Sequence, residues 1–278
     1  MRRPTRLAVL LAVLCVLAPL SATAADPPRG HLLVVGGNGT TDDILRRAVA
    51  TAGGADGLIV IFPQASELPE TGRESAEMWT KAGMGRAVVA TVADAAGVSA
   101  AVKAVEEASF IWFPGGDQVR LVKALEGTPI PDAVRARYQA GALVGGTSAG
   151  AAVMSREMIT GEADLKAIVA GRTELKPGFG LWPEVIVDQH FLKRQRNNRL
   201  ISAVLDHPSL VGVGIDETTA VFVSGASFEV LGQNSVVVID ARRARVERAA
   251  AGGLAAGRGL VMSVLTAGMT YRLDEATW

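Results

Sequence analysis

Ala142-Leu-Val-Gly-Gly-Thr-Ser-Ala-Gly150 is the stretch that decides the fold of this chain. An apolar run ends in Gly146-Thr-Ser-Ala-Gly150, and residues 151–159 can begin a helix. A G-x-S-x-G sequence between a strand and a helix is typical of a sharp turn that exposes the serine hydroxyl at the carboxyl end of the strand. We therefore predict an α/β fold with Ser148 as a candidate nucleophile. The alternative is a glycine-rich turn in which Ser148 only caps the helix.

Four more apolar runs of strand length precede this turn. Runs of Val, Ile and Leu without polar interruption are typical of strands buried on both faces of a parallel sheet. The segments between them include residues 41–52 and 99–108, which have helical spacing. Alternating strands and helices with short links predict a doubly wound sheet with right-handed crossovers. The four runs begin at His31, Gly57, Ala87 and Ser109.

The sequence beyond residue 181 has a different pattern. Short apolar runs follow one another closely, and only residues 192–205 have helical spacing. We expect antiparallel or mixed strands that extend the same sheet and end in an edge hairpin through residues 250–259. Neither an internal repeat nor a linker is visible, so residues 25–278 are expected to form a single domain.

The composition excludes several classes of protein. The chain has 278 residues, of which 49% are hydrophobic, with 28 Lys and Arg against 28 Asp and Glu. This apolar content and charge balance exclude a disordered chain, and the zero net charge argues against a nucleic-acid partner. We expect neither a metal nor another cofactor, because no H-E-x-x-H, C-x-x-C or phosphate-loop motif occurs.

Residues 1–24 have the three-part pattern of a secretory signal peptide. Three arginines precede an uncharged run at residues 7–20, and Ala22-Thr-Ala24 is a small-x-small cleavage site. The run is shorter than the ~20 residues that a spanning helix needs, so we expect a secreted protein with no stable membrane anchor. Cleavage after Ala24 would remove Cys15, the single cysteine, and would leave serine as the nucleophile of the turn.

Ser148 needs a general base and an acid that orients the base. His190 is the candidate base, because it lies at the end of a short strand, where ligands gather in open α/β sheets. Asp216 and Glu217 follow another strand and would lie at the same edge. Either could be the acid, and spacing alone does not choose between them.

A second assignment follows the chain order of ordinary α/β-hydrolases, in which the acid precedes the histidine. It would join Ser148 with Asp188 and His207, and it would indicate an esterase. His207 follows a helix rather than a strand, which favours His190 as the base.

A glycine pair follows the fourth strand, in Phe113-Pro-Gly-Gly-Asp-Gln118. Adjacent glycines let the backbone approach a ligand, and the N–H groups of Gly116 and Ala149 could form an oxyanion hole. Asp117 can also serve as the N-cap of the next helix.

A basic cluster follows His190 directly, with few acids nearby. It consists of Lys193, Arg194, Arg196 and Arg199. A charge run is usually a solvated helix face, but arginine recognises carboxylates in a two-point geometry. The cluster therefore predicts a substrate with a free carboxylate.

Together these motifs resemble the cyanophycinase family of serine exopeptidases, relatives of bacterial aspartyl dipeptidases on a class I glutamine amidotransferase-like fold. The resemblance covers roughly residues 30–272 and is carried by Phe113-Pro-Gly-Gly-Asp-Gln, Gly146-Thr-Ser-Ala-Gly-Ala, Asp188-Gln-His-Phe and Gly214-Ile-Asp-Glu-Thr-Thr-Ala. It implies a three-layer α/β/α sandwich with a mainly parallel central sheet and antiparallel C-terminal strands. It also implies a triad of Ser148, His190 and Glu217. The substrate-binding residues that it implies are Asp117, Gln118, Asp188, Gln189, Arg194, Arg196 and Arg199.

The resemblance further implies hydrolysis of β-aspartyl bonds in cyanophycin, a poly-aspartate with arginine on each β-carboxyl, to β-Asp-Arg dipeptides. One stretch departs from the family: Gly36-Gly-Asn-Gly-Thr40 stands where cytoplasmic cyanophycinases usually have an acidic Gly-Gly-Ala-Glu-Asp. An aspartyl dipeptidase and a non-catalytic binding protein for acidic peptides remain as alternatives, and a homodimer is one possible assembly. Amidotransferase chemistry is excluded, because it uses a cysteine nucleophile.

Overall fold

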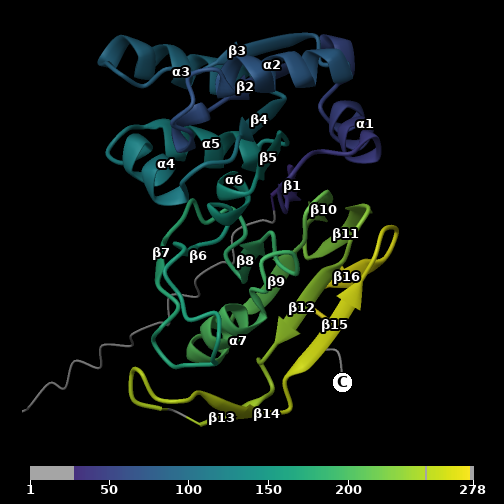
Figure 1. Ribbon diagram of the computed structural model, residues 1–278. Coiled ribbons are helices and arrows are strands. Elements are labelled where there is room, and N and C mark those ends of the chain that lie inside the picture. Colours follow the sequence, from purple (N-terminus) through teal and green to yellow (C-terminus); the bar gives the residue numbers. More distant parts are fainter. Residues whose placement is uncertain (1–27, 248, 276–278) are drawn as a thin grey trace, which may run out of the picture.

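The computed structural model describes residues 28–247 and 249–275, so the expected signal peptide lies outside the described residues. Helices and strands alternate through the first half of the chain, and strands dominate the second half (Figure 1). The helices are α1 (Asp42–Thr51), α2 (Thr71–Ala82), α3 (Ala95–Glu107), α4 (Gln118–Leu125), α5 (Ile130–Gln139), α6 (Ala149–Ala152) and α7 (Asn197–Asp206), with short 3-10 turns at Gly54–Asp56 and Pro63–Ala65.

Eight strands form the central sheet, in the order β16-β11-β10-β1-β5-β4-β2-β3. The five neighbouring strands β1, β5, β4, β2 and β3 are parallel to one another. On the other side of β1, the strands β10, β11 and β16 continue the sheet in antiparallel pairs. The bounds are β1 (His31–Val35), β2 (Leu58–Ile61), β3 (Arg86–Val89), β4 (Phe110–Phe113), β5 (Leu143–Thr147), β10 (Thr219–Ser224), β11 (Ser227–Gly232) and β16 (Thr270–Arg272).

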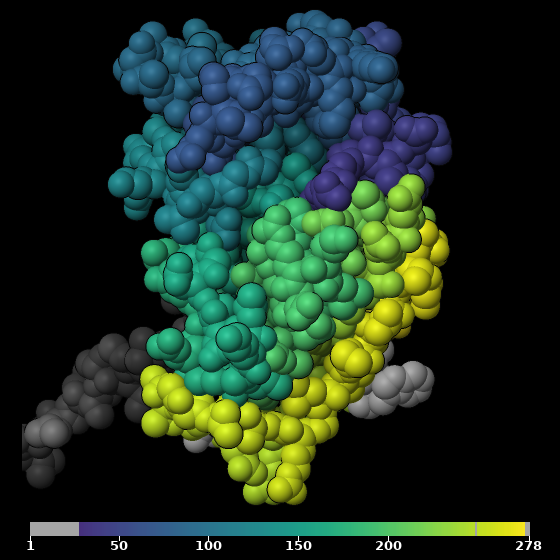
Figure 2. Space-filling view, in the orientation of Figure 1, coloured from purple at the N-terminus to yellow at the C-terminus, as the bar shows by residue number. Residues whose placement is uncertain are grey.

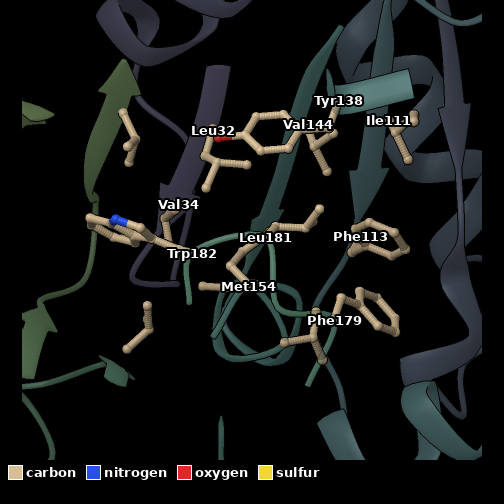
Figure 3. Packing of buried hydrophobic residues seen from close by; sticks show 14 of the residues in the cluster. Leu32, Val34, Ile111, Phe113, Tyr138, Val144, Met154, Phe179, Leu181 and Trp182 are labelled. Atoms are coloured by element: carbon tan, nitrogen blue, oxygen red, sulfur yellow. The ribbon is translucent and has the colours of Figure 1, made fainter. Parts of the chain in front are cut away.

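Both faces of β1, β2, β4 and β5 are covered, as their apolar runs predict, whereas the edge strand β3 is largely exposed. Alternate residues of β1 point to opposite faces, so Leu33 packs with α1 and α2, whereas Leu32 packs with α3, α4 and α5. Figure 3 shows the second of these clusters, in which Tyr138 lies beside Leu32 and Val144, and Phe113 lies against Phe179. The helices and the sheet thus form the α/β/α sandwich expected from the sequence.

A second sheet corrects one expectation. Four C-terminal strands do not extend the central sheet but form a separate one, in the order β15-β12-β9-β8. One face of this sheet packs in the same cluster as β10 and β11, and the other is covered by α7. The apolar runs of three of these strands are therefore buried between layers, whereas the edge strand β15 exposes Met262 and Val264. The bounds are β8 (Val185–Gln189), β9 (Val211–Ile215), β12 (Val236–Asp240) and β15 (Val261–Leu265).

Two local expectations also differ. The predicted hairpin near residues 250–259 exists, but it is a separate pair of β13 (Arg245–Glu247) and β14 (Ala256–Arg258), at the end of the molecule opposite α2 and α3 (Figure 2). The helix expected over residues 151–159 is only the short α6, because the chain turns at residue 153 and enters β6 (Glu157–Ile159), which pairs with β7 (Leu175–Pro177).

Within residues 28–247 and 249–275, no helix is long and apolar enough to cross a membrane.

Candidate active site

Ser148 lies in the sharp turn between β5 and α6 that the sequence predicts. Its backbone has φ 54° and ψ −111°, a region that residues with a Cβ rarely adopt. Side chains on both sides of the turn must be absent, because a Cβ on Gly146 would overlap the backbone of Gly150, and one on Gly150 would overlap the carbonyl oxygen of Phe113. The turn therefore requires the two glycines of G-x-S-x-G and holds the serine in a strained conformation, as in a nucleophile elbow.

Ser148, His190 and Glu217 form one chain of hydrogen bonds. The distance from Ser148 Oγ to His190 Nε2 is 2.9 Å, and that from His190 Nδ1 to Glu217 Oε1 is 2.8 Å. A carboxylate only accepts hydrogen bonds, so Nδ1 carries a proton and Nε2 of the neutral ring can accept the serine proton. This is the arrangement of a nucleophile, a base and an orienting acid.

The environment keeps His190 neutral and Glu217 charged. Burial lowers the pKa of His190, and Arg194 lowers it further, while the hydrogen bond to Glu217 acts in the opposite direction. The hydrogen bond from His190 lowers the pKa of Glu217, with a smaller contribution from Asn38. A neutral imidazole beside an ionised carboxylate is the state that general-base catalysis requires.

The end of β1 holds the backbone of Ser148, of His190 and of Thr218, the residue after Glu217. Three successive carbonyl groups, those of Val35, Gly36 and Gly37, accept hydrogen bonds from the backbone N–H groups of Ser148, His190 and Thr218, at 3.0, 2.8 and 2.8 Å. Ser148 follows β5 in the central sheet, whereas the other two follow β8 and β9 in the second sheet. The expectation that Ser148 and His190 share one sheet edge is therefore wrong, and β1 joins the two sheets at the site.

Gly37 must lack a side chain for the imidazole to fit. Its φ is 121°, and a Cβ there would lie 2.5 Å from Nε2 of His190. We expect Gly37→Ala to displace the ring and to lower kcat/KM about 10²-fold, the usual effect of a displacement of ~1 Å at a reacting group. Steady-state kinetics on the substrates proposed below would measure the loss.

Gly39→Ala is the matched control. Its φ of 106° imposes a similar backbone strain, but the added Cβ would meet only Thr218 Cγ2, at 3.9 Å. Equal losses in the two variants would show that backbone strain, and not the position of the imidazole, explains the effect.

The expected oxyanion-hole residues flank Ser148. Gly115 passes so close that a Cβ on it would lie 3.4 Å from the Ser148 Cβ, and Gly116 follows it before α4. Ala149 opens α6 directly after the serine. Among the described residues, no hydrogen-bond acceptor is found for the N–H of Gly116 or Ala149, so both remain available for a developing oxyanion.

The three arginines of the basic cluster have different environments. Arg199 is only 3% exposed, and its Nε donates to Asp188 Oδ2 at 2.8 Å while Nη2 binds the other carboxylate oxygen. Arg196 donates to the backbone and side-chain oxygens of Gln189, at 2.6 and 2.5 Å, and burial lowers its pKa to about 10. Arg194 is exposed, and no carboxylate partner is found for it among the described residues. Asp188, Gln189, Arg196 and Arg199 thus form an internal network, and Arg194 faces solvent.

The remaining predicted residues have local partners. Asp117 caps α4 by accepting from the Arg120 N–H, at 2.9 Å. Gln118 is buried and donates to the carbonyl groups of Ile159 and Thr160, so it fixes the loop after β6. His207 is exposed at the end of α7. The histidine that is hydrogen-bonded to Ser148 is His190. The roles of all these residues in catalysis or binding stay predictions.

Sequence reasoning missed Asn38. Its Nδ2 donates to Glu217 Oε2 at 2.9 Å, on the carboxylate oxygen that His190 leaves free. The available signal was Gly36-Gly-Asn38 directly after a buried strand, at the edge where the candidate catalytic residues gather. In the described part of the chain, no group of three or more His, Cys, Asp or Glu side chains could hold a metal ion.

A nucleophile elbow and a hydrogen-bonded Ser-His-Glu chain on an α/β/α fold are the arrangement of a serine hydrolase. Comparison with known proteins places it more closely. Residues 32–231 match the model of Peptidase family S51, and the chain belongs to this family. It is therefore a serine peptidase of the cyanophycinase type, as the motifs indicated.

Several curated relatives carry the name cyanophycinase. The chain is 38% identical to the one from Geminocystis herdmanii over 222 residues, which is 76% of this chain and 81% of the relative. It is 40% identical to one from a Nostoc species over 203 residues, 71% of this chain and 68% of the relative. A solved peptidase from an acI-B1 Actinobacterium has the same fold, with a TM-score of 0.64 at 22% identity, over 87% of this chain and 96% of that one.

Proposed function

We propose that this protein is an exported serine exopeptidase that releases β-Asp-Arg dipeptides from cyanophycin. The bond that breaks is the amide of the poly-aspartate backbone, because each dipeptide keeps the β-aspartyl bond to its arginine; this corrects the expected cleavage of β-aspartyl bonds. The observation that carries the proposal is the hydrogen-bonded Ser148, His190 and Glu217 chain beside an exposed arginine. The names of its relatives support cyanophycin as the substrate. The signal-peptide pattern of residues 1–24 supports export.

The residues present supply each step of an acyl-enzyme mechanism. His190 Nε2 takes the proton of Ser148 as Oγ attacks the carbonyl carbon, and the N–H groups of Gly116 and Ala149 bind the oxyanion. Protonated His190, stabilised by Glu217, then gives its proton to the leaving amine. Water attacks the resulting ester with His190 again as the base, which releases the acid and restores Ser148.

Arg194 is the residue best placed to select a β-linked substrate. Each arginine of the polymer is joined through its amino group to a β-carboxyl of the backbone, so its own carboxylate remains free. An exposed guanidinium can bind that carboxylate in a two-point geometry. Arg196 and Arg199 are already bonded within the protein, so their support of the pocket is indirect.

Incubation with cyanophycin and with matched β-Asp-Arg and α-Asp-Arg peptides, with products identified by mass, tests the proposal. We expect β-Asp-Arg to accumulate from the polymer. Cleavage of α-linked Asp-X peptides alone would identify a dipeptidase, and tight binding without products would identify a binding protein.

The pH dependence follows from His190. Because burial and Arg194 lower the pKa of His190 below its ordinary value of 6.5, the ring stays neutral as the pH falls to that value. The acid limb of kcat/KM should therefore lie below pH 6.5. Arg194→Gln removes a positive charge near the ring, so its acid limb should move to higher pH. A wild-type limb above pH 6.5 would contradict the assignment of His190 as the base.

A further inference from the structure

The turn after β1 contacts every member of the candidate triad. Val35, Gly36 and Gly37 hold the backbones of Ser148, His190 and Thr218 through consecutive carbonyl groups. Asn38 is the next residue, and its side chain reaches Glu217 Oε2. Residues 35–38 therefore hold Ser148, His190 and the segment of Glu217 and Thr218 in place. Asn38 is the one of the four that does so through its side chain.

The backbone at Asn38 suits this role. Its φ is 52°, in the left-handed region where asparagine is several times more common than most residues with a side chain. The Thr218 N–H to Gly37 carbonyl bond fastens this turn to the residue after Glu217. The amide group is thus carried on a fixed turn, although the residue is exposed.

Only the amide nitrogen can meet the carboxylate, because two oxygens with lone pairs would repel each other. With Asn38 on Oε2 and His190 on Oε1, each carboxylate oxygen of Glu217 has a donor. The Glu217 backbone carbonyl accepts from Thr219 Oγ1 at 3.0 Å and from Asn234 Nδ2 at 2.8 Å. The side chain of Glu217 is 14% exposed, so without Asn38 its outer oxygen would turn toward water.

We propose that Asn38 is a positioning residue that holds the Glu217 carboxylate in the orientation that His190 requires. This inference rests on the proposed triad and adds a fourth residue to it. The Asn38 amide is hydrogen-bonded to Glu217 and not to Ser148. It acts by restricting the rotation of the carboxylate, which in turn fixes the ring and the tautomer of His190.

Asn38→Gly and Asn38→Asp test the proposal without imposing new backbone strain. Glycine removes the donor and keeps the left-handed turn, so kcat should fall about tenfold with KM nearly unchanged, the usual effect of losing a partner of a catalytic charge. Aspartate is similar in shape but places a second negative charge beside Glu217. Asn234→Ala is the matched control, because Asn234 binds Glu217 only at its backbone carbonyl.

Titration of His190 by NMR separates positioning from simple support of the fold. The charged groups near the ring are Glu217 from the β9 end and Arg194 and Arg196 from the β8 end. Without the Asn38 amide the Glu217 carboxylate can rotate, and its hydrogen bond to the His190 ring becomes weaker. Because that bond raises the pKa of His190, Asn38→Gly should lower it. The extra charge in Asn38→Asp should raise it. Equal pKa values for His190 in the wild type and both variants would overturn the proposal, as would an equal loss of kcat in Asn38→Gly and Asn234→Ala.

Labelling by a fluorophosphonate makes the test independent of the natural substrate. Ser148 Oγ bonds to phosphorus, its proton passes to His190 and fluoride leaves, so the rate reports the catalytic groups without the natural substrate. Asn38→Gly should slow labelling about tenfold, as it slows kcat. If the wild type were labelled but did not cleave cyanophycin, the proposal of cyanophycin as the substrate would be wrong. The proposed role of Asn38 would still stand. A labelling rate unchanged in Asn38→Gly would overturn that role.

Discussion

Ser148→Ala is expected to abolish hydrolysis, with kcat reduced by about 10⁴-fold or more, because serine hydrolases lose that much when the nucleophile is removed. The fold should be unaffected. Alanine keeps a Cβ, so the strain at φ 54° is the same, and within the described residues the hydrogen bond that is lost is the one to His190 Nε2. Steady-state kinetics and thermal unfolding of the same preparation would measure both quantities.

A histidine pair provides the control for this result. His190→Ala should lose a similar share of kcat, whereas His207→Ala should keep full activity, because His207 is exposed at the end of α7. The opposite outcome would favour the order Ser148, Asp188 and His207 of an esterase. Turnover that persists in Ser148→Ala would rule out Ser148 as the nucleophile.

Among the substitutions considered for this site, Arg199→Ala is expected to lower the free energy of unfolding most. The side chain is 3% exposed and pairs with Asp188, which is 1% exposed. Removing one partner of a buried pair typically costs about 3–5 kcal/mol. We expect a loss near the lower end of this range, because Arg196 Nη1 lies 3.8 Å from Asp188 Oδ1 and would still compensate part of the charge. Urea unfolding would measure the loss, and the double variant Asp188→Ala/Arg199→Ala should cost less than the sum of the single ones.

Activity of the same variant separates support from substrate recognition. From the sequence alone, Arg199→Ala should harm β-aspartyl substrates more than an activated ester. The pairing with Asp188 leads us instead to expect similar losses on both. Arg194→Ala is the matched control: it should change stability by less than about 0.5 kcal/mol, as exposed substitutions do, and should reduce turnover of the β-aspartyl substrate alone. A selective loss in Arg199→Ala at unchanged stability would restore its direct role.

The parallel half of the fold could be predicted from the sequence because its signals are local. Short runs of apolar residues in β1, β2, β4 and β5 mark strands covered on both faces, and the helices between them have their own spacing. The C-terminal strands have runs of similar length, but a run does not say which neighbour a strand will pair with. Long-range packing against β10 and β11 on one face and α7 on the other selected a second sheet.

The candidate site divides in the same way. G-x-S-x-G is a local turn in which glycines are needed for steric reasons, so Ser148 could be found in the sequence. The choice of Glu217 over Asp216 came from the family resemblance, and the structure shows a geometric difference: Glu217 reaches His190, whereas Asp216 accepts from the Lys193 N–H. Asn38 was missed because its partner lies 179 residues away in the chain.

The sequence by itself therefore determined the elbow, the parallel α/β core, the basic cluster and the family resemblance, all of which depend on residues close together in the chain. The tertiary structure decided which histidine meets Ser148, which arginine remains exposed and which residue supports Glu217. Those outcomes depend on strands from two different sheets that meet at the end of β1. Their side chains come within hydrogen-bond distance only after both sheets have packed, so no local pattern could specify them.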